Sequence, residues 1–481
     1  MGPEEFRRHG HALVDWIAAY LSQDDRYPVL SRAAPGEVRE RLPAAPPEAG
    51  TPFDAVFADF ERHLLPGITH WNHPGFFAYF AISGSGPGVL AELLAAALNV
   101  QAMLWRTSPA ATELEEVALG WLRQLLGLPA AFEGVIYDTA SVASLHALAA
   151  AREAAVPDVR GGGLAGRAEL APCRVYLSEH AHSSIDKAVM TLGLGQRALQ
   201  RIAVDDRFRM RPDALRAAVA ADRAAGRTPL AVVATVGTTS MTSVDPVPAI
   251  ADVCEAEGIW LHVDAAYAGA AALVPETAWV LDGCGRADSV VVNPHKWLFT
   301  PFDLSAFYSR RMDAIRAAFA LTPDYLATPE AGRVRNLMDT GVQLGRRFRA
   351  LKLWAVLRYF GAAGIRARLA EHMRLARLFA GWVDASDHFE RLAPVPLSVV
   401  CFRARPRAWQ EPGDDAEGGR LERLNARVLE AVNGSGEVFL SHTRIEGRFA
   451  LRLAIGHIRT EQRHVERAWT LLREAASAGA A

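Results

Sequence analysis

The first 85 residues carry hydrophobic positions at helical spacing on both sides of a proline-rich segment. Within residues 1–30, Leu13 and Ile17 lie on the apolar face of an expected amphipathic helix. The segment Pro28–Pro52 holds too many breakers for a long regular element, and a second short helix is expected around Ala55–Leu65. A helical pair with this much apolar surface cannot stand alone, so we expect it to pack on another domain or another subunit.

From about residue 86 the pattern changes to short apolar runs separated by helical or loop segments. The clearest helix is Ala111–Leu126, for which Ser108-Pro109 supplies an N-cap and a first-turn proline. The expected strands are Val135–Tyr137, Arg174–Ser178, Ile202–Val204, Leu230–Val236, Trp260–Asp264, Ser289–Asn293 and Ser305–Tyr308. This alternation predicts an α/β domain with a mainly parallel sheet, which binds ligands beyond the carboxyl ends of its strands.

The remaining segments complete a three-part organisation. The glycine-rich stretch Val159–Ala171 is expected to be a loop, and a helical run from Leu344 is expected to end at Gly361 and Gly364. Strands of a smaller α+β unit are expected at Ser398–Arg403, Val438–Ser441 and Arg448–Ile455. The predicted parts are an N-terminal helical arm (1–85), a large domain (86–345) and a small C-terminal domain (346–481).

Composition narrows the classes of function. The 481 residues carry 52 Lys+Arg against 54 Asp+Glu, which disfavours a nucleic-acid-binding protein and a polybasic membrane-binding protein. The four cysteines are scattered without a CxxC spacing, so a reducing cytoplasm is favoured over a disulfide framework or a zinc knuckle. We see no secretory signal and no apolar run of membrane-spanning length, and therefore expect a cytoplasmic protein.

Two segments place reactive side chains directly after expected strands. In Asn293–Trp297 (NPHKW), Lys296 is a candidate Schiff-base nucleophile, although a surface lysine after a strand would give the same pattern. In Trp260–Gly269 (WLHVDAAYAG), Asp264 could pair with a protonated heteroaromatic nitrogen, and the small residues beyond it leave room for a flat ring. An Asp at this place could also simply cap the next helix.

Two more segments fit a phosphate-bearing planar cofactor. His182, in Ser178–Lys187, could lie over a ring or transfer protons near neutral pH, and it could also be a hydrogen-bonded structural residue. The segment Asp138–Ser144 (DTASVAS) places small hydroxyl residues at a helix start, where backbone N–H groups and the helix dipole favour a phosphate. Plain N-capping would use the same residue types.

An aromatic run surrounds a pair of histidines near the end of the arm. His70 and His73 have HxxH spacing, but no helix holds them and no acidic or cysteine partner stands nearby, so no metal site is expected. The run Trp71–Phe80 is interpreted as the wall of an aromatic substrate pocket, with ordinary core packing as the alternative.

Together these segments resemble the group II pyridoxal-phosphate-dependent amino-acid decarboxylases, in particular the aromatic-L-amino-acid decarboxylase family. The resemblance covers nearly the whole chain: NPHKW with HVDAAYAG is its most specific part, and HWxxPxFFAYF, SPAATELE and LGRRFRALKLW add to it. It implies PLP fold type I (aspartate-aminotransferase-like) with a mixed, mainly parallel seven-stranded sheet in the large domain. It also implies pyridoxal 5′-phosphate (PLP) as cofactor and a homodimer with shared active sites.

The resemblance also implies residue roles. Lys296 would bind the cofactor covalently, Asp264 would pair with its pyridine nitrogen, His182 would stack above the ring, and Tyr325 would be the loop tyrosine that protonates the product carbon. The implied cofactor-binding set is Thr139, Ala140, Ser141, His182, Thr239, Asp264, Ala266, Ser289, Asn293, His295 and Lys296. The implied substrate-binding set is Trp71, Tyr79, Phe80, Ile82, Met103 and His182, with Met103 contributed across the dimer interface.

Several positions depart from the family pattern and leave the substrate open. Val142 stands where the family has a phosphate-loop glutamate, and Ile82 replaces a threonine that can hydrogen-bond a catechol in the animal enzymes. Met103 replaces an aromatic residue, and Arg106-Thr107 replaces small residues.

The expected reaction is decarboxylation of an L-amino acid, with an aromatic side chain favoured by the aromatic run. Alternatives are an aldehyde synthase, a decarboxylase of a non-aromatic amino acid, a non-catalytic homologue, and an aminotransferase in which Arg106 binds a second substrate carboxylate. Aldehyde synthases of this family lose the loop tyrosine or the stacking histidine, so the presence of both Tyr325 and His182 favours decarboxylation.

Overall fold

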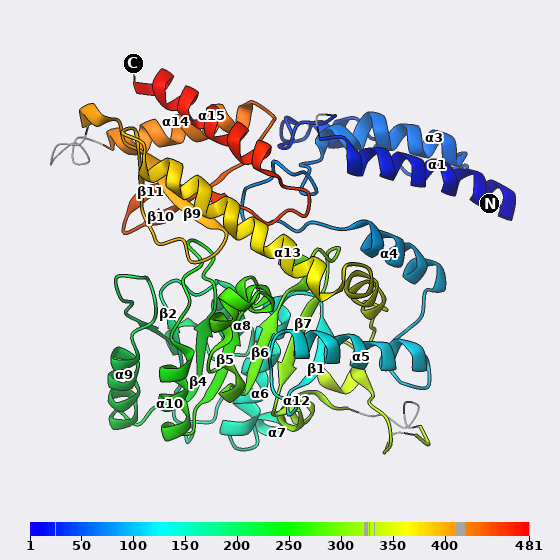
Figure 1. Cartoon of the computed structure of the whole chain (residues 1–481). Helices are drawn as coiled ribbons and strands as arrows, with labels where there is room; N and C mark the ends of the chain where they lie inside the picture. Colours follow the sequence, from blue (N-terminus) through cyan, green and yellow to red (C-terminus); the bar gives the residue numbers. More distant parts are fainter. Residues whose placement is uncertain (25, 322–325, 327, 331, 410–418, 481) are drawn as a thin grey trace. The chain divides into compact units, whose positions relative to one another are not determined.

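The chain divides into two compact units in the computed structural model, which describes residues 1–24, 26–321, 326, 328–330, 332–409 and 419–480 (Figure 1). The larger unit comprises Ile82–Ala380 and Ala393–Cys401. The smaller unit comprises Met1–Ala81, Gly381–Leu392 and Phe402–Ala481. The domain boundaries near residues 85 and 345 stay a prediction.

A seven-stranded sheet in the order β1-β7-β6-β5-β4-β2-β3 forms the centre of the larger unit. Its strands are β1 (Glu133–Tyr137), β2 (Cys173–Ser178), β3 (Leu199–Ile202), β4 (Thr228–Thr235), β5 (Trp260–Asp264), β6 (Ser289–Val292) and β7 (Ser305–Ser309). β7 runs antiparallel to both of its neighbours, and the other adjacent pairs are parallel. The expected mixed, mainly parallel seven-stranded sheet is confirmed.

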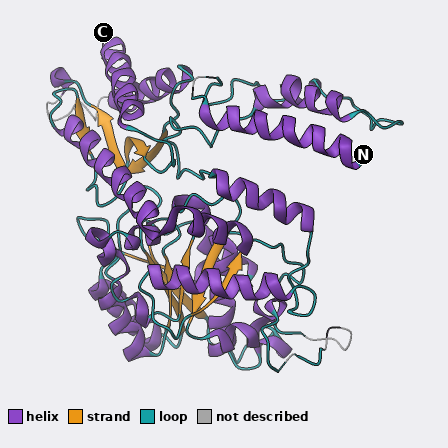
Figure 2. Ribbon diagram, turned by 45° about the vertical axis from the view of Figure 1, so that its right-hand side comes forward, coloured by secondary structure: helices purple, strands orange, loops and turns teal. Residues whose placement is uncertain are grey.

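Helices cover both faces of this sheet (Figure 2), which is why its central strands are buried along almost their whole length. The helices of the larger unit are α4 (Gly86–Leu98), α5 (Pro109–Leu125), α6 (Ala140–Ala155), α7 (Val159–Gly162), α8 (Ser184–Thr191), α9 (Pro212–Ala224), α10 (Val247–Glu257), α11 (Pro294–Trp297), α12 (Met312–Phe319) and most of α13 (Ala350–Asp384). α6 packs across β4, β5 and β6. Ser108 caps α5 as expected, because its hydroxyl accepts the Ala111 N–H.

The smaller unit contains a second sheet in the order β10-β11-β9-β8, with antiparallel pairing of β10 with β11 and of β8 with β9. The strands of this sheet are β8 (Phe389–Arg391), β9 (Val399–Ala404), β10 (Ser441–Ile445) and β11 (Arg448–Ala454). β9 begins in the segment assigned to the larger unit, and only Phe402–Ala404 of it belong to the smaller unit. Its helices include α1 (Pro3–Ser22), α2 (Glu37–Glu40), α3 (Phe53–Asp59), α14 (Arg420–Gly434) and α15 (Gln462–Ala480). The expected α+β character of the C-terminal region is confirmed, and helices are present in the N-terminal segment as expected.

Two expected strands are displaced. β3 is Leu199–Ile202 rather than Ile202–Val204, because these residues pair with β2, whereas Val204 makes an isolated bridge to Met210. The strand expected at Val438–Ser441 was wrong in position: β10 begins at Ser441.

Two helix expectations also need correction. The helix expected from Leu344 begins only at Ala350, and it continues to Asp384 with an interruption at Gly361, which has φ +61°. A positive φ suits glycine, which lacks a Cβ. The expected loop Val159–Ala171 begins with the short helix α7. None of the helices in the described part of the chain combines the length and apolar character that crossing a bilayer requires.

Candidate active site

Five parallel strands of the larger unit lead directly into segments that carry predicted cofactor residues. Thr139 follows β1, His182 follows β2, Thr239 follows β4, Asp264 ends β5 and Lys296 follows β6. Because the carboxyl ends of parallel strands meet at one edge of a sheet, the topology gathers these segments there.

The electrostatics of His182 show that three of these side chains are close. Burial lowers the pKa of His182, the charge of Asp264 raises it and the charge of Lys296 lowers it. The Nδ1 of His182 accepts the Ser184 N–H at 3.1 Å and lies 2.9 Å from the Ser184 hydroxyl, so the ring proton of the neutral form belongs on Nε2. His182 is thus a neutral Nε2–H donor near pH 7.

Asp264 is the buried carboxylate of the site. It lies at the end of β5, opposite Thr235 of β4 and Val291 of β6, and it is 6% exposed. Its Oδ1 accepts the Ala266 N–H at 3.1 Å, so it holds the turn that follows. It does not cap the next helical segment, whose N-cap is Tyr267 and which has no side-chain capping bond. A carboxylate in this buried position can also stabilise a protonated ring nitrogen.

Hydrogen bonds fix the turn that carries Lys296. The Asn293 N–H donates to the Ala266 carbonyl at 3.0 Å, and the Ser305 hydroxyl donates to Asn293 Oδ1 at 2.6 Å. His295 accepts the Leu304 N–H at 2.9 Å, and burial together with the charge of Lys296 lowers the pKa of His295 to about 3. His295 is therefore neutral and serves to hold the turn.

Two aromatic rings join the lysine turn to the loop after β5. Trp297 and Tyr267 stack with ring centroids 4.6 Å apart and an interplanar angle of 6°. The indole N–H of Trp297 donates to His372 Nδ1 at 2.9 Å, and the Tyr267 hydroxyl lies 2.6 Å from the Ser398 hydroxyl. The stack therefore joins the residue that follows Lys296 to the loop that follows Asp264.

The start of α6 has the features of an anion site. The side chain of its N-cap, Thr139, makes no capping hydrogen bond, and Ser141 in the first turn is exposed. The first-turn N–H groups of a helix have no intrahelical acceptor. A buried ion pair supports this end of β1: Arg346 Nη2 lies 2.8 Å from Glu115 and donates to the Ile136 carbonyl, while the Ile136 N–H donates to Glu115.

The predicted cofactor residues Ser289, Thr239 and Ala266 differ from one another in burial and in hydrogen-bond partners. Ser289 begins β6 and is fully buried, with its hydroxyl engaged by His262 and Trp260 rather than exposed at the carboxyl edge. Thr239 is exposed in the loop after β4. Gly237 precedes it at φ +87°, and a Cβ there would lie 2.4 Å from that of Ala268, so only glycine lets the β4 and β5 loops approach this closely. Ala266 is 7% exposed.

The predicted substrate residues fall into two groups. Ile82 and Met103 belong to the larger unit, where Met103 packs with Leu104 and Met338. Trp71, Tyr79 and Phe80 belong to the smaller unit, where Trp71 stacks on Tyr79 at 5.6 Å. Tyr325 lies outside the described residues.

The HxxH histidines have structural partners. His70 Nδ1 lies 2.9 Å from the Tyr20 hydroxyl, and burial lowers the pKa of His70 to about 4. His73 accepts the Gly75 N–H at 2.9 Å. Among the described residues, no group of three or more His, Cys, Asp or Glu side chains has an arrangement that could hold a metal ion.

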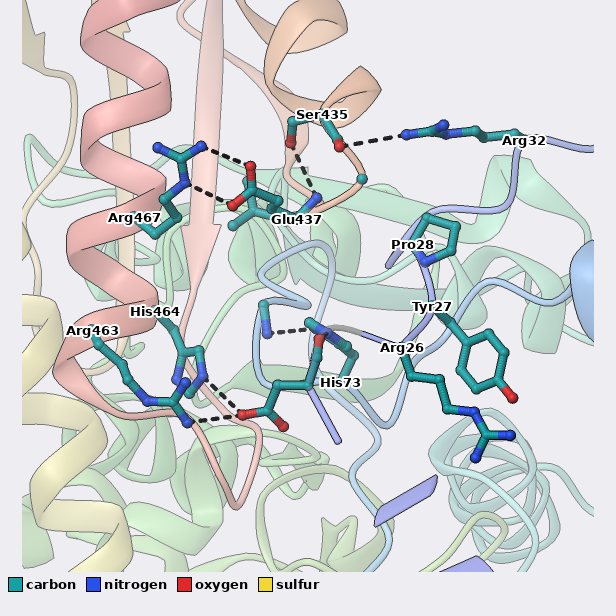
Figure 3. Close-up of a pocket in the computed structure, with 14 residues that line it drawn as sticks. Arg26, Tyr27, Pro28, Arg32, His73, Ser435, Glu437, Arg463, His464 and Arg467 are labelled. Carbon is teal, nitrogen blue, oxygen red and sulfur yellow. Dashed lines mark hydrogen bonds and ion pairs between the residues drawn. The ribbon is translucent and has the colours of Figure 1, made fainter. Parts of the chain in front are cut away.

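A cavity of about 600 Å³ in the smaller unit contains none of the predicted cofactor residues (Figure 3). Its acidic side chains are already paired: Asp24 with Arg463 at 2.9 Å and with His464 at 3.3 Å, and Glu437 with Arg467 at 2.7 Å. The cavity is therefore distinct in composition from the predicted reaction site, and none of the described residues that line it is a lysine.

Comparison with known proteins decides the family. The sequence model of the pyridoxal-dependent decarboxylase conserved domain matches residues 35–405. The chain belongs to the pyridoxal-dependent decarboxylase family. It is 38% identical to tryptophan decarboxylase 2 of Oryza sativa subsp. japonica and 36% identical to phenylacetaldehyde synthase of a Rosa hybrid cultivar, in each case over 99% of this chain and 95% of the relative.

The fold of this decarboxylase family member is also that of solved relatives. The crystal structure of Oryza sativa TDC with PLP and tryptamine matches with a TM-score of 0.94 and 36% identity, over 99% of both chains. The expected PLP fold type I is thereby confirmed. The enzyme is a PLP-dependent carboxy-lyase, and its site fits that cofactor: an amine on Lys296, a buried carboxylate on Asp264 and the uncapped start of α6.

Sequence reasoning missed the residues that hold the site together. Tyr267 and Trp297 lie inside the recognised motifs, and their aromatic side chains could have indicated that the two motifs pack against each other. Glu115 and Arg346 stood inside SPAATELE and LGRRFR, whose pairing could not be read from either segment alone.

Proposed function

We propose that this PLP enzyme decarboxylates an aromatic L-amino acid to the corresponding amine and CO₂. The observation that carries the proposal is the gathering of Lys296, Asp264 and His182 at the carboxyl edge of the sheet. The aromatic side chain is supported by the stacked rings of Trp71, Phe76 and Tyr79 and by the relative from Oryza sativa subsp. japonica named for tryptophan.

The proposed roles follow from the chemistry of each side chain. When bound, PLP supplies an electron sink for the carbon that loses CO₂. The Lys296 amine would bind it covalently, Asp264 would keep its ring nitrogen protonated, and Ala140 and Ser141, with Thr139 and Asn293, would hold its phosphate. His182 would lie against the ring with its Nε2–H as a proton source, and Tyr325 would protonate the product carbon.

An aldehyde synthase is the second candidate, because the chain is as similar to the rose phenylacetaldehyde synthase as it is to decarboxylases. The presence of His182 and Tyr325 favours the amine. The aminotransferase alternative loses support because Arg106 lies 3.4 Å from Glu330, so its charge already has a partner.

We further propose a homodimer with shared active sites, built around α4. Leu90, Leu93, Leu94 and Leu98 on this helix are 54–60% exposed. Burial of one leucine side chain contributes about 1.5–3 kcal/mol, so four exposed leucines on one helix favour association. The family resemblance indicates that a second copy of the chain covers these leucines. A cytoplasmic location is proposed from the scattered spacing of the four cysteines, which contains no CxxC.

Sedimentation of the parent and of a Leu90→Glu/Leu94→Glu variant tests the dimer. We expect a dimeric parent and a largely monomeric variant, because two buried carboxylates would oppose association. Exposed Met190 on α8 provides the control, since Met190→Glu should stay dimeric. A dimeric α4 variant, or a monomeric parent, would contradict the assignment.

The substrate proposal is tested by incubating the purified enzyme with each proteinogenic amino acid and identifying both CO₂ and the organic product. Aromatic amino acids should give amines. An aldehyde with ammonia would establish the synthase instead, and CO₂ from a non-aromatic amino acid alone would contradict the aromatic assignment.

A further inference from the structure

A chain of buried hydrogen bonds joins helix α6 to strands β5 and β6. His262 Nε2 lies 3.1 Å from the Ser144 hydroxyl, and His262 Nδ1 lies 2.9 Å from the Ser289 hydroxyl. The Trp260 indole N–H donates to the same Ser289 hydroxyl at 3.1 Å. Ser144, His262 and Ser289 are all 0% exposed.

A neutral imidazole suits this position. It has one donor and one acceptor nitrogen, and each serine hydroxyl can take the complementary role, so one ring satisfies both contacts. Burial lowers the pKa of His262 to about 4, although Asp264 opposes this effect. The ring therefore stays neutral near pH 7 and can contact both hydroxyls at once.

Ser144 and His262, two members of this chain of bonds, lie next to the two proposed anchors of the cofactor. His262 precedes Asp264 by two residues on β5, so both side chains point to the same face of the sheet. Ser144 follows Ala140 by one helical turn, so both lie on the same side of α6. The Ser144–His262 contact therefore connects the helix that carries the phosphate residues to the strand that carries the carboxylate.

We propose that His262 is a positioning residue that sets the spacing between the start of α6 and Asp264, and so lets one cofactor engage both anchors at once. The proposal rests on the phosphate and ring-nitrogen roles proposed above for Ser141 and Asp264. Loss of the bridge would let α6 shift against β5, which weakens the fit at both ends of the cofactor without removing any group that contacts it.

PLP titration of the apoenzyme tests the role directly. Ser144→Ala removes one oxygen and His262→Phe removes both contacts while keeping a ring. In both we expect the Kd for PLP to rise about tenfold or more, equivalent to about 1.4 kcal/mol, and the absorption maximum of the bound cofactor to shift. With an aromatic substrate, kcat should fall while KM changes little, because the substrate pocket is untouched.

His146→Gln is the matched control. His146 is also buried on α6, but it packs on Tyr137 at 4.4 Å and on Phe319 at 4.6 Å. This variant should keep the parent Kd and absorption maximum even where its thermal midpoint falls.

Parent-like PLP affinity and spectrum in Ser144→Ala and in Ser289→Ala would overturn the proposal, whatever happens to thermal stability. Where His262→Phe does not fold, these two serine variants decide the question. If the parent enzyme binds PLP but releases no CO₂, the proposed reaction is contradicted. The comparison of PLP affinities between the parent and the variants still tests the role of His262.

Discussion

At the scale of single residues, Lys296 is the proposed covalent anchor of the cofactor. Lys296→Ala should abolish CO₂ release and the absorbance of covalently bound cofactor, because no other amine follows β6 in the segment that the motif occupies. Lys187→Ala is the control: this exposed lysine contributes to the electrostatics of His182 but lies on α8, and its loss should leave the absorbance unchanged. Equal loss in both variants would refute the special role of Lys296.

Tyr325 is the residue that should choose between amine and aldehyde. Tyr325→Phe leaves the Lys296, Asp264 and His182 side chains in place, so CO₂ should still be lost. Without its proton donor, the carbon that lost CO₂ should react with O₂ and water to give aldehyde, ammonia and hydrogen peroxide. Product analysis under air and under nitrogen checks this. Amine at the parent rate, with no peroxide under air, would show that another group donates the proton.

At the scale of secondary-structure elements, the buried Glu115–Arg346 pair joins α5, β1 and the segment before α13. Their side chains are 3% and 6% exposed. Arg346→Met should destabilise the enzyme by about 3–5 kcal/mol, because it leaves a buried carboxylate without its cation. Thermal and urea unfolding measure this loss.

The surface pair Arg7–Glu4 is the control for that prediction. Its side chains are 62% and 82% exposed, so Glu4→Gln should change stability by less than about 1 kcal/mol. The double variant Glu115→Leu/Arg346→Met should recover part of the loss. Similar effects of the buried and surface substitutions would contradict the account.

The sequence predicted the elements whose residues are buried on both faces and missed those defined by polar partners. β4 and β6 were found because they contain continuous apolar runs, Leu230–Ala234 and Val290–Val292. β10 was misplaced because its residues are polar except for Ile445, so it has no apolar run, and its start at Ser441 depends on pairing with Arg452 of β11. The segment before Ala350 looks helical by periodicity, but Arg346 is held in its place by Glu115.

The site residues that belong to a single sequence motif could be predicted from the sequence. Asp264 and Lys296 can be recognised as candidate site residues because each lies at or just after the end of an expected strand. The partners of His262 cannot be recognised in this way, because Ser144 and Ser289 lie 118 and 27 residues away from it in the chain. Packing between elements that are distant in the sequence decides which side chains support a site. Short-range sequence patterns contain little information about this packing.

At the scale of the whole molecule, buried histidines should set the acid limit of stability. Burial lowers the pKa values of His70, His146 and His262 to about 4. In the unfolded chain these rings take up protons near pH 6.5. Stability should therefore be fully present above pH 6.5 and should fall as the pH decreases from 6.5 towards 4, with proton uptake on unfolding.

Thermal midpoints measured between pH 7.5 and 4.5 check this dependence. His146→Gln should flatten the slope, and replacement of the exposed His11 should leave it unchanged. A midpoint that rises as the pH falls through this range would contradict the sign.

The central claim is that the chain is a PLP-dependent decarboxylase of aromatic amino acids. The most direct measurement is the release of CO₂ from carboxyl-labelled L-tryptophan, L-tyrosine and L-phenylalanine by the PLP-loaded enzyme, with the amine quantified in the same reaction. The account predicts equal amounts of CO₂ and amine from at least one of these substrates, and neither from Lys296→Ala. PLP-loaded enzyme that releases no CO₂ from any of the three would contradict it.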